Sequence, residues 1–165
     1  KVLSEHDEAR DTDGTNRRTP VWLCQFKVTN PSGYSNFRTG SNAVDFSSDG
    51  SILAICYGNM ITLWDHKEAT LLTALQHVDN DRAPIESLSF VKTALLKDLI
   101  LTRSRTGVAL QSPYGKGKES WSWALPANYK DAFVTHVELI PSHDLVAVCI
   151  TYHKKMKTQV FLLNA

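Results

Sequence analysis

The chain has 165 residues, of which 42% are hydrophobic, and this length is enough for a domain with a buried core. Eighteen basic residues stand against 17 acidic ones, and the net charge of +1 gives no global electrostatic reason to expect nucleic acid or a membrane as partner. The longest apolar runs, such as LVAVCI at 145–150, are far shorter than the ~18 residues that cross a bilayer, so we expect no membrane partner.

Residues 1–19 are mostly charged or small polar residues without apolar periodicity, which predicts a flexible linker. VWLCQF at 21–26 then begins a series of short apolar strands that alternate with polar turn clusters, a pattern typical of all-β proteins. Helical spacing can also be argued for residues 90–101, but we predict a turn between two strands there. Single cysteines in apolar segments favour buried free thiols over disulfides or a zinc site. These cysteines are Cys24, Cys56 and Cys149.

The strands and turns recur in three similar units. The first, at 42–75, contains four strands, NAVDF, ILAICY, MITLW and TLLTAL, and the second, from Ile85, also has four. The third, from Phe133, has three strands and lacks a fourth. Phe46 and Phe90, at equivalent positions of the first two units, are about 44 residues apart, close to the ~40–45 residues of a four-stranded propeller blade. The sequence therefore predicts an all-β propeller portion of about three four-stranded blades.

The first unit contains the stretch VDFSSDGSILAICYGNMITLWD. Asp49 and Gly50 make a turn in which glycine can take positive φ, and Trp64 is large enough to fill the gap between neighbouring blades. For Asp65, a structural hydrogen bond and a contact with a partner both fit. The stretch resembles the WD-repeat family of β-propellers, whose blades share the strand, Ser-x-Asp-Gly turn, apolar strand and Trp-Asp ending. The later units keep the hydrophobic layout but lack the Trp-Asp dipeptide.

The order of further segments, from VWLCQF through KDLILTRSRTGVALQ and SWSWAL to TQVFLLN, is similar to that of nucleolar WD-repeat subunits of the small-subunit processome. This resemblance implies a non-catalytic scaffold in the nucleus and its nucleolus, which acts in pre-rRNA processing and ribosome biogenesis and is linked to rRNA transcription. It implies other protein subunits of a large ribonucleoprotein assembly as partners, pre-rRNA or small nucleolar RNA as a further partner, and no cofactor or small-molecule substrate. A WD-repeat adaptor in trafficking or ubiquitin ligation is an open alternative, because the fold alone does not separate the two.

The resemblance also divides the chain. Residues 1–19 would be a flexible linker or the end of a preceding blade, and 20–41 would be the outer strand of that blade with an interblade loop. Residues 42–75 and 76–124 would each form a blade, and 125–165 a partial blade. Because three blades cannot close a ring and an open edge exposes unpaired backbone groups, we expect the sequence to be part of a longer chain.

Residues with catalytic or metal-binding chemistry are better explained as structural. Ser142, His143 and Asp144 are adjacent on an expected turn, where they cannot line up as a catalytic triad. GKGKES at 115–120 lacks both the spacing and the following helix of a phosphate loop. The six histidines suggest no metal site, and we expect His136 in the core or between blades. We therefore expect no enzyme; a propeller-based enzyme would need a His or carboxylate cluster around the central channel.

Three basic segments and one aromatic loop are candidates for contact with RNA or protein. The basic segments are NRR at 16–18, the lysines of GKGKES, and HKKMK at 153–157 in an expected turn, and plain solvation is the alternative for them. Contact with RNA phosphates is favoured only if these turns converge on one face. The loop NPSGYSNFRTGSN combines two aromatic residues with an arginine, which suits either a binding hot spot or packing against its own blade. The candidate contact residues are Arg17, Arg18, Tyr34, Phe37, Arg38, Lys116, Lys118, Lys154, Lys155 and Lys157.

Overall fold

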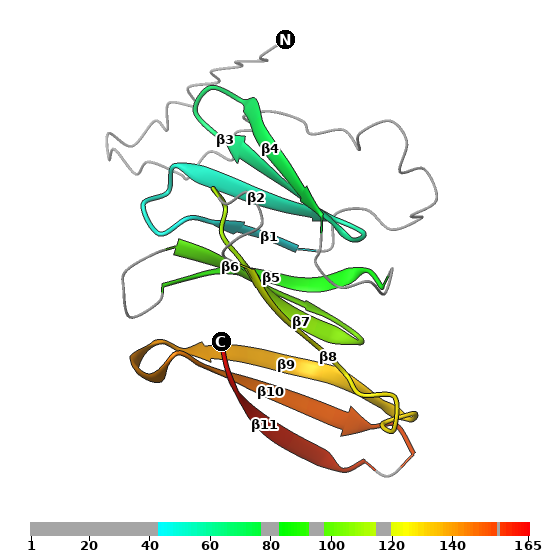
Figure 1. Ribbon diagram of the computed structural model, residues 1–165. Coiled ribbons are helices and arrows are strands. Elements are labelled where there is room, and N and C mark those ends of the chain that lie inside the picture. Colours follow the sequence, from blue (N-terminus) through cyan, green and yellow to red (C-terminus); the bar gives the residue numbers. More distant parts are fainter. Residues whose placement is uncertain (1–42, 77–82, 93–97, 115–119, 155) are drawn as a thin grey trace, which may run out of the picture.

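The computed structural model describes residues 43–76, 83–92, 98–114, 120–154 and 156–165. Within these ranges the chain forms eleven β-strands and one short 3-10 helix, and the strands pair into three antiparallel sheets (Figure 1). The first sheet has the strand order β1-β2-β3-β4, the second β5-β6-β7-β8 and the third β9-β10-β11. None of the described residues belongs to a helix long and apolar enough to cross a membrane.

Each sheet is a meander, in which strands that follow one another in the sequence are also neighbours in space. The elements are β1 (Ala43–Phe46), β2 (Ile52–Tyr57), β3 (Met60–Asp65), β4 (Thr70–Gln76), β5 (Ile85–Lys92), β6 (Asp98–Ser104), β7 (Gly107–Gln111), β8 (Ser120–Ala124), β9 (Ala132–Ile140), the 3-10 helix η1 (Pro141–His143), β10 (Leu145–Tyr152) and β11 (Thr158–Asn164).

The first sheet follows the local sequence closely. Gly50, in the connection between β1 and β2, has φ of 70°, and Gly58, between β2 and β3, has φ of 59°. Both angles lie in the left-handed region that glycine reaches without steric cost, so each glycine allows the chain to reverse tightly. The four strands expected for this unit are confirmed, and so are the two strands on either side of the turn expected within 90–101.

Two hydrophobic cores join the three sheets face to face (Figure 1). The first core lies between the first and second sheets and includes the fully buried Ile61, Ile85 and Ile100. The second lies between the second and third sheets and includes the fully buried Val108 and Val134. Burying one such side chain contributes about 1.5–3 kcal/mol relative to leaving it in water. The predicted all-β architecture of about three blades is confirmed, with two four-stranded sheets and one three-stranded sheet.

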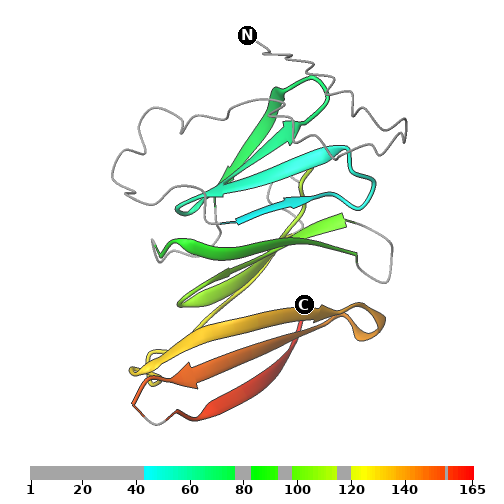
Figure 2. The same ribbon diagram turned by 180° about the vertical axis from the view of Figure 1, so that it is seen from behind.

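The stacking gives the described part of the chain two rims, one at each end of the strands. At the leading rim, on the right in Figure 1 and on the left in Figure 2, β1, β5 and β9 begin and the β2–β3, β6–β7 and β10–β11 connections lie. At the trailing rim the β1–β2, β3–β4 and β9–β10 connections lie. All three sheets have the same orientation, so equivalent connections of successive sheets share a rim.

Candidate functional site

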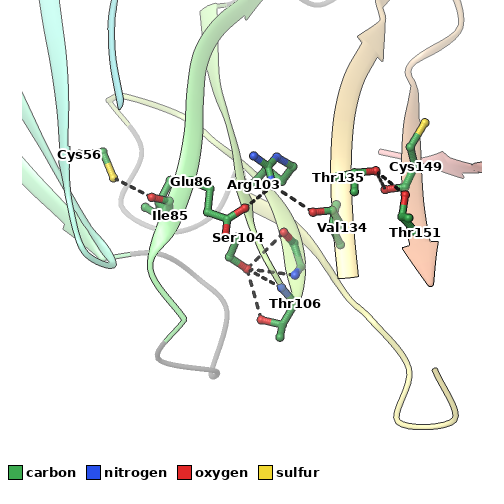
Figure 3. A network of polar contacts seen from close by, with 11 residues as sticks. Cys56, Ile85, Glu86, Arg103, Ser104, Thr106, Val134, Thr135, Cys149 and Thr151 are labelled. Atoms are coloured by element: carbon green, nitrogen blue, oxygen red, sulfur yellow. Dashed lines mark hydrogen bonds and ion pairs between the residues drawn. The ribbon is translucent and has the colours of Figure 1, made fainter. Parts of the chain in front are cut away.

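The leading rim carries a charged clamp where the second sheet meets the third. Arg103 lies near the end of β6, and its Nη1 donates hydrogen bonds to Oε2 of Glu86 on β5 and, over 3.0 Å, to the carbonyl oxygen of Val134 on β9 (Figure 3). The side chain of Arg103 is only 15% exposed. A planar guanidinium can satisfy several acceptors at once, so one side chain ties together three strands from two sheets.

The β6–β7 turn is held by its own hydrogen bonds and presents Arg105 at its tip. Ser104 Oγ accepts hydrogen bonds from the backbone N–H groups of Thr106 (3.3 Å) and Gly107 (3.0 Å), as Figure 3 shows in part. The carbonyl oxygen of Arg105 accepts a hydrogen bond of 2.9 Å from the backbone N–H of Val134. The turn is therefore fixed against the beginning of β9, while the side chain of Arg105 remains exposed.

An aromatic ring lies directly beside this arginine. The guanidinium carbon of Arg105 is 5.0 Å from the centre of the Phe133 ring, within the range of a cation–π interaction. The His153 ring meets Phe133 at an interplanar angle of 66°, with 6.3 Å between the ring centres. His153 is held in place because its backbone N–H donates a 2.9 Å hydrogen bond to the carbonyl oxygen of Asp131. The carboxylate of Asp131 also lies 3.7 Å from Lys154 Nζ.

At the trailing rim, carboxylates build turns. Asp49 Oδ1 accepts hydrogen bonds from Ser47 Oγ (2.7 Å), Ser51 N (3.0 Å) and Ser51 Oγ (2.8 Å). The hydrogen bond from the Ser47 hydroxyl, followed by those from Ser51, lowers the pKa of Asp49 to about 2. Asp65 Oδ1 accepts from two backbone N–H groups of the β3–β4 turn, over 2.9 and 3.1 Å. Both aspartates thus act as caps for the backbone.

The two rims differ in charge. Each rim comprises the last two residues at each strand end and the described parts of the connections, with histidine taken as neutral. Of these described residues, five at the leading rim are basic and two are acidic, a net charge of +3, whereas two at the trailing rim are basic and six are acidic, a net charge of −4. The leading-rim residues are Arg103, Arg105, Lys130, Lys154, Lys157, Glu86 and Asp131; the trailing-rim residues are Lys67, Lys92, Asp45, Asp49, Asp65, Glu68, Asp98 and Asp144.

Two of the predicted contact residues, Lys154 and Lys157, lie in the β10–β11 connection at the leading rim, and both are exposed. The connection that contains Lys116 and Lys118 joins the end of β7 to the start of β8, and these strand ends are at the trailing rim. Contact of these lysines with RNA or protein stays a prediction. The predicted contact residues outside the described ranges are Arg17, Arg18, Tyr34, Phe37, Arg38, Lys116, Lys118 and Lys155.

Trp64 lies on the side of the first sheet that faces away from the second. Its Nε1 donates a hydrogen bond of 2.9 Å to Thr62 Oγ1, and Thr62 alternates with the core residues Ile61 and Leu63 along β3. The indole is thus outside the core between the first two sheets. Its predicted place between blades concerns the other face of the sheet and stays a prediction.

His136 is exposed on β9, so the prediction that it lies in the core is wrong. Its alternative place between blades concerns the face of the third sheet that points away from the second sheet, and stays a prediction. The pairing of β9 with β10 shifts register between Cys149 and Ile150, where Val134 pairs with Ile150 but His136 pairs with Cys149. This bulge adds one residue to β9 and reverses which side chains face the core from that point. Without the bulge, His136 would follow Val134 on the buried face.

The segment Ser142-His143-Asp144 is the exposed connection between β9 and β10. Ser142 Oγ lies 2.6 Å from His143 Nδ1, and Asp144 has φ of 49°, in the left-handed region. Among the described residues, no group of three or more His, Cys, Asp or Glu side chains could hold a metal ion. The sequence did not predict a site at Arg103, Arg105 and Phe133, because nothing in their local sequence pattern indicates that they lie close together.

A family model described as the second β-propeller of WD repeat-containing protein 75 matches residues 6–111. Among solved structures, the chain is similar to the β-propeller domain of Cps50 (Swd1) from Myceliophteria thermophila, with a TM-score of 0.45 and 12% sequence identity. That match covers 76% of this chain and 41% of the other, so this chain spans less than half of that domain. No curated protein sequence matches.

Proposed function

The chain belongs to the family of the second β-propeller of WD repeat-containing protein 75, and from this membership we propose that it is a non-catalytic scaffold in the nucleolar small-subunit processome. It would act in pre-rRNA processing and ribosome biogenesis, linked to rRNA transcription, by holding other protein subunits. The observation that carries the proposal is the family match over residues 6–111, which includes the first sheet and most of the second.

The described surfaces support a scaffold. WD-repeat propellers mediate contacts between proteins, and both rims here are formed by short connections that are fixed by hydrogen bonds of their own. Rigid connections lose little conformational entropy when a partner binds, which favours binding. The most exposed charged groups lie on these rims rather than in the cores. We also propose that residues 42–75, 76–124 and 125–165 correspond to two blades and a partial blade, preceded by 20–41 as the outer strand of another blade.

The proposal is tested in cells by depletion and rescue. The tagged protein should concentrate in nucleoli, and depletion should cause unprocessed pre-rRNA to accumulate, as measured on RNA blots. The unaltered chain and the surface variant Lys67→Glu should restore processing, whereas Ile61→Asp, which places a carboxylate in the first core, should not. A purely cytoplasmic protein with normal pre-rRNA after depletion would refute the processome role and favour a WD-repeat adaptor elsewhere.

A further inference from the structure

We propose that the leading rim, at the junction of the second and third sheets, binds an acidic peptide segment of a partner protein, with Arg105 as the central contact. This inference rests on the proposed scaffold function and names the chemistry of one partner. The surface consists of Arg105, Phe133 and His153, with the flanking lysines Lys154 and Lys157.

Arg105 is positioned for binding by its backbone and by the Phe133 ring. Its backbone carbonyl holds the N–H of Val134, so the backbone is fixed whatever the side chain is. The side chain is exposed, and among the described residues no carboxylate forms an ion pair with it. The contact with the Phe133 ring limits the positions that the guanidinium can take, so its N–H groups can meet a carboxylate with a smaller loss of entropy.

The neighbours of Arg105 add positive charge that is weakly compensated. Lys154 and Asp131 are 3.7 Å apart, and their side chains are 77% and 58% exposed. An exposed pair of this kind contributes little to stability, so an incoming carboxylate can compete for the lysine. His153 lies at the edge of the same surface, and Lys157 is the residue directly before β11. Among the described residues, the net charge is +3 on this rim and −4 on the other, and this difference favours an acidic segment at this end of the sheets.

An acidic peptide fits this surface better than RNA does. One face of Phe133 is covered by Arg105 and the ring also meets His153, so the ring does not offer an open platform for stacking a base. Glu86 and Asp131 lie among the basic residues and would repel a continuous phosphate backbone. The carboxylates of a peptide stand on flexible side chains and can meet the cations one at a time.

The experiment measures binding directly, with the full chain and three fluorescent probes at low and at physiological salt. The probes are a peptide of alternating glutamate and glycine, a peptide of alternating lysine and glycine, and an oligouridylate of the same length. Fluorescence anisotropy should show binding of the glutamate peptide that weakens as salt is added, and no comparable binding of the other two probes. Binding of the oligouridylate without binding of the glutamate peptide would overturn the proposal in favour of RNA, and no binding of either would refute it.

A matched pair of variants locates the contact. Arg105→Glu should weaken binding of the glutamate peptide about tenfold or more, the loss typical of an arginine that dominates an interface. Lys92→Glu makes the same change of charge at the trailing rim and should leave the affinity unchanged. Arg105→Gln, which removes the charge without reversing it, should give an intermediate loss. Urea unfolding of each variant checks that it is folded; equal affinities for Arg105→Glu and Lys92→Glu would show that the peptide binds elsewhere.

This result is independent of the cellular test. If the glutamate peptide fails to bind while the protein is nucleolar and required for pre-rRNA processing, the leading-rim proposal fails and the scaffold proposal stands. If the peptide binds as described but the protein is cytoplasmic and dispensable for processing, the surface is real and the processome role is wrong.

Discussion

We expect Asp45 to stabilise the contact between the first and second sheets, although its sequence context suggests only a polar residue in a strand where polar and apolar residues alternate. Its Oδ2 accepts a hydrogen bond of 2.8 Å from the backbone N–H of Phe90 on β5, and its Oδ1 accepts one of 2.8 Å from the N–H of Phe46. Asp45 is half-buried, and the hydrogen bond to Phe90 is partly buried. Asp45→Ala removes the acceptor and leaves the N–H of Phe90 without its partner.

The size of the loss follows from this geometry. A hydrogen bond to a charged group contributes about 1.5–3 kcal/mol, and water can partly replace the acceptor at a half-buried site. We therefore expect Asp45→Ala to lower the free energy of unfolding by about 1.5–2 kcal/mol, near the bottom of that range. Asp45→Asn keeps an oxygen acceptor but loses the charge. Its loss of unfolding free energy should therefore be about half that of Asp45→Ala, because a neutral hydrogen bond replaces the charged one.

Urea unfolding followed by tryptophan fluorescence measures these differences. The dependence of the unfolding free energy on urea should stay the same, so that the midpoint alone reports stability. Glu68→Ala is a suitable control, because Glu68 is exposed in the β3–β4 connection and a surface change of this kind stays within about 0.5 kcal/mol. If Asp45→Ala shifts the midpoint no more than Glu68→Ala does, the contact with Phe90 does not hold the two sheets together.

Three further predictions concern single residues. Hydrogen bonds lower the pKa of Asp49 from 3.8 to about 2. The ionised Asp49 carboxylate should therefore stabilise the fold fully above the pKa of the unfolded chain, and this stabilisation should be lost as the pH falls from about 4 toward 2. The drop in urea midpoint on acidification should be smaller for Asp49→Asn. Burial raises the pKa of Cys56 to about 12, so mass spectrometry should find its alkylation at neutral pH slow in the native protein and fast in urea; equal rates would contradict the burial. Ile61→Ala, at a fully buried position, should cost about 2–5 kcal/mol in urea unfolding, whereas Val160→Ala, at a side chain that is 60% exposed, should cost far less.

The strands were predictable because their determinants are local. Apolar runs, their lengths and the glycines at 50 and 58 lie within a few residues of the structures they specify. The repeat of about 44 residues then relates one sheet to the next without any knowledge of their contacts. The same reasoning predicts a third sheet with three strands, since the third unit contains three apolar segments.

The clamp and the arginine surface were not predictable, because they depend on distances between segments that are far apart in the sequence. Arg103 meets Val134 across 31 residues, and Arg105 meets Phe133 only because the β6–β7 turn lies against the start of β9. His136 shows the same limit for a single strand. Its exposure depends on a bulge in the pairing with β10, and strand alternation read from the sequence assumes that no such bulge exists.

The junctions between the sheets show how the Trp-Asp signature can be lost while the architecture remains. The backbone N–H of Ile85, at the start of β5, donates a hydrogen bond of 2.7 Å to the carbonyl oxygen of Gly58 in the β2–β3 turn. The N–H of Val134, near the start of β9, donates one of 2.9 Å to the carbonyl oxygen of Arg105 in the β6–β7 turn. The two junctions are thus joined at equivalent places by backbone groups, which require no particular side chain.

This arrangement separates stability from function at the leading rim. In both junctions the hydrogen bond is accepted by the carbonyl oxygen of the turn residue, a glycine at 58 and an arginine at 105, so this bond does not depend on the arginine side chain. An exposed arginine can therefore stand at the second junction without weakening it, in a position whose backbone is already fixed. For this reason Arg105→Glu should change binding while leaving the urea midpoint near that of the unaltered chain. A large loss of stability in that variant would mean that the side chain, and not the carbonyl, holds the two sheets together.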